Sequence, residues 1–291
     1  MALPANKNLK LNFITGIGRS GTTVLTQLLN RHPAVHCLPE ANFMLFFLYH
    51  FDGKTSFAAT DIDLIFEQID LFELSHPFVG WTFDKTETRK QADAYLRENT
   101  TASYTELCRI IYRNFKVVGD EKTNAELLVD KNPSYTLFMP QLSEAVSQAK
   151  FIHILRDHRA NILSRKQSVY LESPHVAYNA IRWLLFNKKA MRFGARHKDK
   201  FLSLRYEDLA RDADGETEKV CRFLGIDASI KLSSLPVLQN AEAESPIMPE
   251  KFKKRFEKKY SDLNKPVNAS RIDSWKEQLS TEEIATCDAI C

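Results

Sequence analysis

The 291 residues are 44% hydrophobic and 26% charged, with a formal net charge of +3. This composition is that of a globular protein, and it excludes a disordered chain, a fibre or a collagen-like repeat. The weakly basic balance suits an anionic small ligand but falls well short of the basic footprint of a nucleic-acid-binding protein. Length alone allows one or two domains, and the charge predicts a small-molecule partner and no nucleic acid.

The N-terminal residues lack the apolar run of a signal peptide, and no stretch of about 18 uncharged apolar residues occurs. The five cysteines are scattered at spacings that fit neither a disulfide framework nor a zinc site. These features predict a reduced, cytoplasmic protein that does not enter a membrane. They leave the oligomeric state open.

Strand and helix patterns alternate along the chain. An alternating, β-rich stretch over residues 9–15 meets a Gly-rich turn, and residues 22–31 then carry apolar side chains at helical spacing. Further strands are predicted over 35–38, 127–130, 151–155 and 201–204, and further helices over 135–148, 176–196 and 216–224. Such alternation predicts an α/β fold, with a parallel β-sheet flanked by helices.

Two segments interrupt this rhythm. Residues 42–122 are rich in phenylalanine and predicted to be a helical insertion after the second strand, which either covers a pocket or adds core helices. Residues 250–265 are strongly basic, which fits either a solvated helix face or a loop that folds over an anionic ligand.

A glycine loop, GIGRSGTT at residues 16–23, separates the first strand from the first helix. Glycines permit a tight turn, and free amides at a helix start attract phosphate. The loop fits the dinucleotide pattern G-x-G-x-x-G, with Glu40 near the position of a ribose-binding acid. It also fits a P-loop, except that Thr22 replaces the lysine. A third interpretation keeps the phosphate cradle and supplies its positive charge from Arg19.

The third interpretation carries a family resemblance. Residues 19–23 (RSGTT) resemble the 5′-phosphosulfate loop of sulfotransferases that use 3′-phosphoadenosine 5′-phosphosulfate (PAPS). Residues 151–159 (FIHILRDHR) are similar to the strand and turn from which that family binds the 3′-phosphate, with Arg156 followed eight residues later by Ser164. A guanidinium fork and a hydroxyl suit a terminal phosphate. Neither rival pattern predicts this pair. The family usually has proline where His158 stands.

Other segments extend the resemblance over most of the chain. DKNP at residues 130–133 is similar to the Asp/Glu-Lys-x-Pro segment of the family, and YEDL at 206–209 to a segment whose tyrosine lies by the adenine. KPVN at 265–268, followed by Trp275, resembles the segment that closes over the cofactor. The match is closer to bacterial and tyrosylprotein-like sulfotransferases than to the mammalian cytosolic ones. It implies a P-loop-like fold in one sulfotransferase domain over residues 1–291, with acceptor choice in residues 42–122.

The resemblance also implies roles for individual residues. Glu40 is the expected general base. Two alternatives stay open: His36 is the base, or Glu40 instead stabilises the start of a helix through its charge. Arg19 and Lys131 are expected to neutralise the leaving phosphate, so that no metal is required. The residues expected to bind PAPS, or its product PAP, are Gly18, Arg19, Ser20, Gly21, Thr22, Thr23, Arg156, Ser164 and Tyr206, with Ser270 and Arg271 as further candidates.

Three other functions stay open at this point. A P-loop kinase would need the missing lysine and Mg²⁺. A PAPS-binding module without catalysis would not need Glu40, Arg19 and Lys131 together, and an oxidoreductase would need nicotinamide contacts downstream. The acceptor is equally open, among a sugar, a phenol, a metabolite hydroxyl or amine, and a peptide tyrosine.

Overall fold

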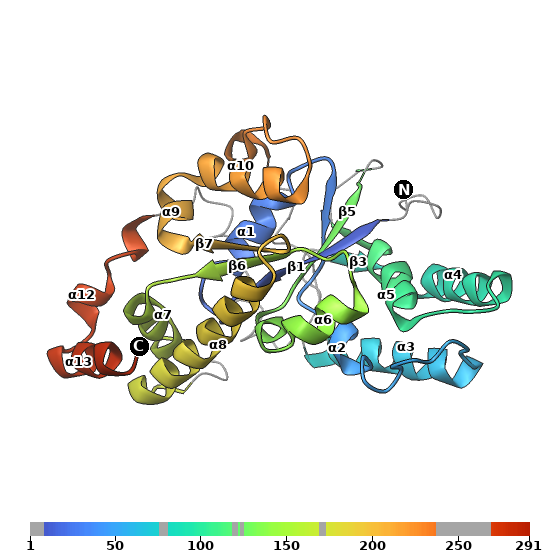
Figure 1. The fold of residues 1–291 in the computed structure, drawn as a ribbon, viewed down its shortest axis with the longest axis horizontal. Coiled ribbons are helices and arrows are strands. Elements are labelled where there is room, and N and C mark those ends of the chain that lie inside the picture. The colour runs from blue at the N-terminus through green and yellow to red at the C-terminus, as the bar shows by residue number, and fades with distance from the viewer. Residues whose placement is uncertain (1–8, 76–80, 118–121, 123–124, 169–172, 237–268) are drawn as a thin grey trace.

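The computed structural model describes residues 9–75, 81–117, 122, 125–168, 173–236 and 269–291. A five-stranded parallel sheet has the order β2-β5-β1-β6-β7 (Figure 1). Its strands are β1 (Lys10–Thr15), β2 (Val35–Cys37), β5 (Leu127–Lys131), β6 (Phe151–Leu155) and β7 (Phe201–Arg205). The predicted α/β fold is therefore confirmed.

Helices cover both faces of this sheet (Figure 1). Side chains alternate between the faces, as the period of a strand requires, so that Phe13 and Ile14 of the central strand enter different cores. The Ile14 core includes side chains of α1 (Thr22–Leu29), α9 (Tyr206–Arg211) and α10 (Ala213–Leu224). The Phe13 core includes side chains of α6 (Met139–Ala145) and α8 (Val176–Arg196), while α7 (His158–Lys166) packs beside α8.

The insertion after β2 contains helices and, in addition, a small antiparallel ribbon. Its helices are α2 (Phe43–Phe46), α3 (Ala59–Ser75), α4 (Lys85–Glu98) and α5 (Tyr104–Arg113), and its strands are β3 (Trp81–Phe83) and β4 (Phe115–Val117). Phe83 pairs with Phe115 across the ribbon, and their rings stack with centroids 4.4 Å apart. Such aromatic cross-strand pairs stabilise short strands. The purely helical prediction for this segment was thus incomplete.

Two predicted helices have different bounds in the structure. The helix expected over 135–148 is divided into the 3₁₀ helix η1 (Pro133–Leu137) and α6, which has Pro140 in its first turn, where proline is tolerated. The helix expected from Glu216 begins earlier, at Ala213, because the Asp212 side chain accepts a hydrogen bond from the Gly215 amide and caps it.

The described residues of the C-terminal part form short helices. They are η2 (Leu232–Ser234), η3 (Ala269–Arg271), α12 (Trp275–Gln278) and α13 (Thr281–Ile290). The basic stretch 250–265 and the KPVN segment at 265–268 lie outside the described residues. Of the helices that the structure describes, none combines the length and apolar character needed to cross a membrane.

Candidate functional site

The glycine loop follows β1 and has a backbone that only glycine fits at two positions. Gly16 has φ 143° and Gly21 has φ 100°. A Cβ on Gly21 would lie 2.4 Å from the ring of Tyr206, and one on Gly16 would lie 2.7 Å from the carbonyl oxygen of Ile154. Arg19, between them, is also left-handed with φ 72°. Close approach of the loop to β6 and α9 therefore requires both glycines.

Two buried side chains from α7 hold this loop. The carbonyl oxygen of Gly18 accepts hydrogen bonds from Asn161 Nδ2 and Arg165 Nη1, each at 3.1 Å. Asn161 Nδ2 also donates to Ser20 Oγ at 3.0 Å. Sequence reasoning missed both residues. Their sequence signal is weak, because α7 (HRANILSRK) contains other polar residues besides these two.

The start of α1 presents backbone amides toward the loop. Gly21 is the N-cap and provides no side-chain cap, while Thr22 and Thr23 are the first helical residues. Uncapped amides at a helix start attract anions, because their dipoles point outward and they lack intrahelical acceptors. The residues expected to bind the 5′ end thus run from the turn at residues 18–21 into the first two residues of this helix.

Arg156, at the end of β6, contacts the glycine loop directly. Its Nη1 donates to the carbonyl oxygen of Arg19 at 3.0 Å, and its Nη2 to that of Arg271 at 3.2 Å. The guanidinium lies 4.5 Å from the centroid of the Tyr206 ring. Burial lowers the pKa of Arg156, and the nearby Arg19 charge lowers it further. Among the described residues, no group accepts a hydrogen bond from its buried Nε.

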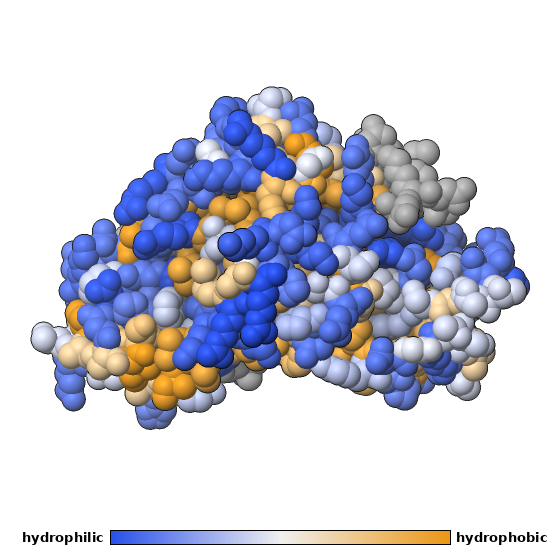
Figure 2. All heavy atoms as spheres, in the orientation of Figure 1, coloured by the Kyte–Doolittle hydropathy of each residue, from blue (hydrophilic) through white to orange (hydrophobic). Residues whose placement is uncertain are grey.

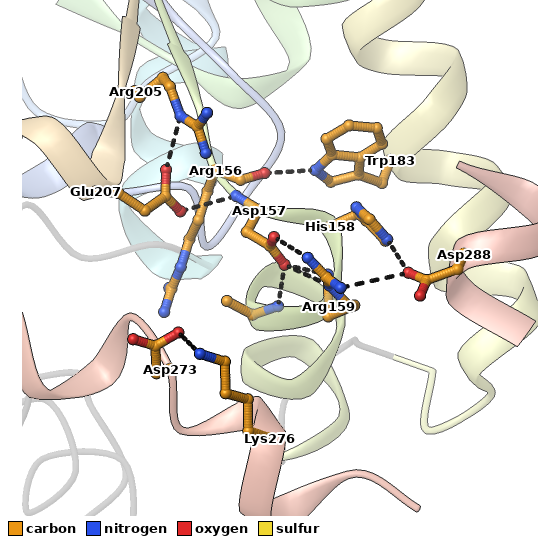
Figure 3. A network of polar contacts seen from close by, with 11 residues as sticks. Arg156, Asp157, His158, Arg159, Trp183, Arg205, Glu207, Asp273, Lys276 and Asp288 are labelled. Atoms are coloured by element: carbon orange, nitrogen blue, oxygen red, sulfur yellow. Dashed lines mark hydrogen bonds and ion pairs between the residues drawn. The ribbon is translucent and has the colours of Figure 1, made fainter. Parts of the chain in front are cut away.

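Hydrogen bonds with α7 and α9 hold the turn after Arg156 (Figure 3). The Asp157 carboxylate caps α7 by accepting from the amides of Arg159 and Ala160, while its own amide donates to Glu207 Oε1 at 2.8 Å. Burial raises the pKa of Asp157, but the hydrogen bonds from Arg159 and the helix start outweigh it and lower the pKa overall. Sequence reasoning missed the buried Glu207 as a partner of this turn.

His158, the departure from the family pattern, is the first residue of α7, a position that proline also favours. The cap by Asp157 shows that the turn forms without proline. His158 Nε2 lies 2.7 Å from Asp288 Oδ1 on α13 (Figure 3). The Arg159 guanidinium lies 3.9 Å from the centroid of the Trp275 ring. These two contacts link α7 to the C-terminal helices.

Arg19 and Ser164 come together across the two motifs. Arg19 Nε donates to Ser164 Oγ at 3.1 Å, so the loop cation lies beside the expected 3′-phosphate ligand. Arg271 approaches the same site through its carbonyl oxygen. The side chain of Ser270 lies outside the described residues.

Glu40 and Lys131 form an ion pair at the ends of β2 and β5. The Lys131 side chain is only 6% exposed, whereas that of Glu40 is 48% exposed. His36, the alternative base, lies within β2 and is 5% exposed. The structure thus unites two of the expected catalytic residues and gives Glu40 the more accessible side chain.

The model of the Sulfotransferase family matches residues 13–229, which include the glycine loop, Glu40, Lys131, Arg156 and Tyr206. The chain belongs to the sulfotransferase family. A putative protein-tyrosine sulfotransferase from Caenorhabditis briggsae is 21% identical to this sulfotransferase over 288 residues, 97% of this chain and 86% of the relative. Nodulation protein NoeE from Sinorhizobium fredii is 26% identical over 298 residues, 94% of this chain and 62% of the relative.

Solved structures give the same fold for this sulfotransferase. The sulfotransferase domain of the Synechococcus PCC 7002 olefin synthase has a TM-score of 0.55 at 22% identity, covering 98% of this chain and 96% of that one. The sulfotransferase domain from the curacin biosynthetic pathway has a TM-score of 0.58 at 18% identity, covering 98% of both chains. In the part of the sulfotransferase that the structure describes, no three His, Cys, Asp or Glu side chains gather as a metal-binding group.

Proposed function

We propose that this sulfotransferase moves a sulfuryl group from PAPS to a hydroxyl or amine of a small-molecule acceptor, in the cytoplasm and without a metal ion. One contact carries the proposal. The Arg156 guanidinium donates to the carbonyl of Arg19 at 3.0 Å, which joins the expected 3′-phosphate ligand to the expected 5′-phosphosulfate loop. A kinase or an oxidoreductase would have no need for this junction.

The residues fit a donor with phosphate groups at both ends of its ribose. The uncapped start of α1 offers amides to the 5′ end. The buried Nε of Arg156 has no acceptor among the described residues, and a buried donor of this kind is costly unless a ligand or water satisfies it. A 3′-phosphate oxygen is the acceptor that we propose for it. Tyr206, stacked on the same guanidinium, lines this end.

When bound, PAPS supplies the sulfuryl group and leaves as PAP. Arg19 and Lys131 stabilise the negative charge that develops on the leaving phosphate oxygen, as fixed cations do best in a preorganised site. Glu40 takes the proton of the acceptor as the new bond to sulfur forms. Lys131 holds the Glu40 carboxylate through their ion pair, and so couples the base to the leaving-group side.

The exposed fractions support Glu40 over His36 as the base. A base must reach an acceptor that enters from solvent, and the Glu40 side chain is 48% exposed. His36 is enclosed within the sheet. A non-catalytic PAPS-binding module would not need the Glu40–Lys131 pair.

A protein tyrosine is the second candidate acceptor. The observation that favours it is the similarity, over 97% of this chain, to a putative protein-tyrosine sulfotransferase. Release of PAP from PAPS, measured with a panel of phenols, sugars, amines and tyrosine peptides, separates the candidates. We expect turnover with a small molecule. Turnover with tyrosine peptides alone would transfer the proposal to the second candidate.

Removal of metal tests the proposed chemistry against the kinase alternative. Activity should persist in EDTA, because Arg19 and Lys131 occupy the electrostatic role that Mg²⁺ has in kinases. The measurement is the rate of PAP release with and without EDTA. Loss of activity in EDTA and recovery with Mg²⁺ would contradict the proposal.

A further inference from the structure

A buried carboxyl group lies close enough to the proposed base Glu40 for their charges to interact. Asp130 precedes Lys131 in β5 and is fully buried. Its Oδ2 lies 2.7 Å from the hydroxyl oxygen of Tyr112, from α5, and 2.6 Å from that of Tyr135, from η1. Its Oδ1 has no hydrogen-bond partner among the described residues. A buried carboxylate with one oxygen unsatisfied is costly, whereas a neutral carboxylic acid is much less so.

The same tyrosines contact the backbone that follows Glu40. The amide of Met44 donates to the hydroxyl oxygen of Tyr112 at 3.2 Å. The hydroxyl of Tyr135 lies 3.1 Å from the carbonyl oxygen of Ala41. Both tyrosines are buried, and residues 41–44 run from Glu40 into the first residues of α2. Asp130 thus lies at the centre of a network that ends on this short segment.

The count of protons favours a neutral Asp130. The Tyr135 hydroxyl has one proton and two acceptors, namely Asp130 Oδ2 and the Ala41 carbonyl. If Asp130 is ionised, its carboxylate accepts the hydrogen bond from Tyr135, and the Ala41 carbonyl loses its donor. If Asp130 is protonated, its own O–H donates to Tyr135, and Tyr135 donates to Ala41. Of the two forms, only the protonated acid supplies a donor to both contacts of the Tyr135 hydroxyl.

We propose that Asp130 is a positioning residue, kept as a neutral carboxylic acid, which acts through Tyr135 and Tyr112 to fix residues 41–44 and so hold Glu40 beside Lys131. This inference rests on the proposed role of Glu40 as the base. It assigns Asp130 no contact with substrate.

The surroundings agree with a neutral acid. Burial raises the pKa of Asp130 to about 7, although hydrogen bonds from Tyr135 and Tyr112 and the charge of Lys131 oppose the shift. Burial also raises the pKa of Cys108 and of the nearby tyrosine hydroxyls, so these groups keep their protons through neutral pH. The titratable groups that face Asp130 are Tyr104, Cys108 and Tyr112 from α5, Tyr135 from η1, Lys131 from β5 and Glu40 from the loop after β2.

The test uses hydrolysis of PAPS by water, which needs no identified acceptor and still requires a base. In the wild type, the rate at saturating PAPS should fall as the pH rises above about 7. Above this pH the Tyr135 hydroxyl donates to the ionised Asp130, and its hydrogen bond to the Ala41 carbonyl is lost. Asp130→Asn is neutral at every pH, so this alkaline fall should be absent. Tyr135→Phe should lower the rate roughly 10- to 100-fold at all pH values, because a small displacement of a catalytic group is enough for such a loss.

Two controls make the outcome clear. PAP affinity should be unchanged in both variants, which shows that they fold. Tyr95→Phe, on α4 against the same core, should behave as the wild type. An unchanged alkaline fall in Asp130→Asn, or a wild-type rate in Tyr135→Phe, overturns the positioning role. If Glu40→Gln itself leaves hydrolysis unchanged, the proposed base is wrong instead, so the two failures are distinguishable.

Discussion

Individual charged residues at this site are held by different kinds of partner, and their expected contributions differ accordingly. Arg156 is buried and donates to two backbone carbonyls. Lys131 is buried against a carboxylate that is half exposed. Exposed pairs such as Lys276–Asp273 contribute little, since solvent screens them. We therefore expect substitutions at Arg156 and in the Glu40–Lys131 pair to have large, specific effects.

Glu40→Gln keeps the shape of the side chain and removes its basicity. We expect kcat to fall by roughly 10²–10⁴, because proton removal by a positioned base contributes about that factor. PAP affinity should stay nearly unchanged, because glutamine keeps the shape of the side chain that lies against Lys131. Steady-state kinetics and calorimetric titration of PAP measure the two effects. His36→Gln is the matched control and should retain turnover.

A different result would give Glu40 another role. If Glu40→Gln keeps its turnover and loses about 1 kcal/mol or less in the free energy of unfolding, Glu40 serves the helix that follows it. The test for the base would then move to His36.

At the scale of elements, the start of α1 depends on one glycine. Gly21→Ala should lower both the free energy of unfolding and PAP affinity, because the new Cβ would lie 2.4 Å from the Tyr206 ring. Gly53→Ala is the matched control, since Gly53 also has a positive φ but has nothing within 4 Å of an added Cβ. The control should cost about 1–2 kcal/mol from backbone strain alone. Chemical denaturation and PAP titration measure both variants.

An equal loss of stability in Gly21→Ala and Gly53→Ala, with PAP affinity intact, would mean that the approach of α1 to Tyr206 has no role in binding.

The sequence predicted the elements that local pattern specifies and missed those that depend on distant partners. Strands β1, β2, β5 and β6 are almost continuously buried runs between turn residues, so they were predictable. Strand β7 was predicted as well, although only Leu204 of it is buried. The β3–β4 ribbon was not, because each strand has three residues and Phe83 finds Phe115 only in the folded chain. Asn161 and Arg165 were missed for the same reason, since their partner is a backbone carbonyl in the glycine loop.

At the scale of the whole molecule, a buried histidine joins the sheet to α8. His153 in β6 lies 3.2 Å from Thr15 Oγ1 and 3.0 Å from Asn187 Oδ1, and it is fully buried. Burial lowers the pKa of His153 from 6.5 to about 4, although the hydrogen bond with Asn187 opposes this. Between these pH values the unfolded chain binds more protons than the folded one. The free energy of unfolding must therefore decrease as the pH decreases.

We expect the wild type to lose about 3 kcal/mol more free energy of unfolding than His153→Gln when the pH falls from 7 to 4. Asp130 has the opposite sign, because its raised pKa stabilises the fold at low pH, and it cancels in this comparison of variants. Urea denaturation at each pH is the measurement. Parallel pH profiles of the two proteins would show that His153 is not kept neutral in the core.

The central claim is that the two motifs together form a site for a nucleotide with a 3′-phosphate. Their junction is Arg156, which contacts the glycine loop and lies between α9 and the C-terminal segment (Figure 3). Figure 2 shows one face of the molecule with mostly hydrophilic side chains and with apolar side chains gathered in patches among them. An anionic nucleotide with phosphates at both ends is the ligand that this arrangement would bind best.

Calorimetric titration of PAP and of adenosine 5′-phosphosulfate against the wild type and Arg156→Ala tests this claim most directly. Adenosine 5′-phosphosulfate lacks the 3′-phosphate, so only PAP can use a charge-assisted contact with Arg156. Such a contact contributes roughly 1.5–3 kcal/mol, and the substitution should weaken PAP by about 10- to 150-fold while changing the other ligand little. Equal weakening of both ligands would mean that Arg156 serves the fold, and it would contradict the account.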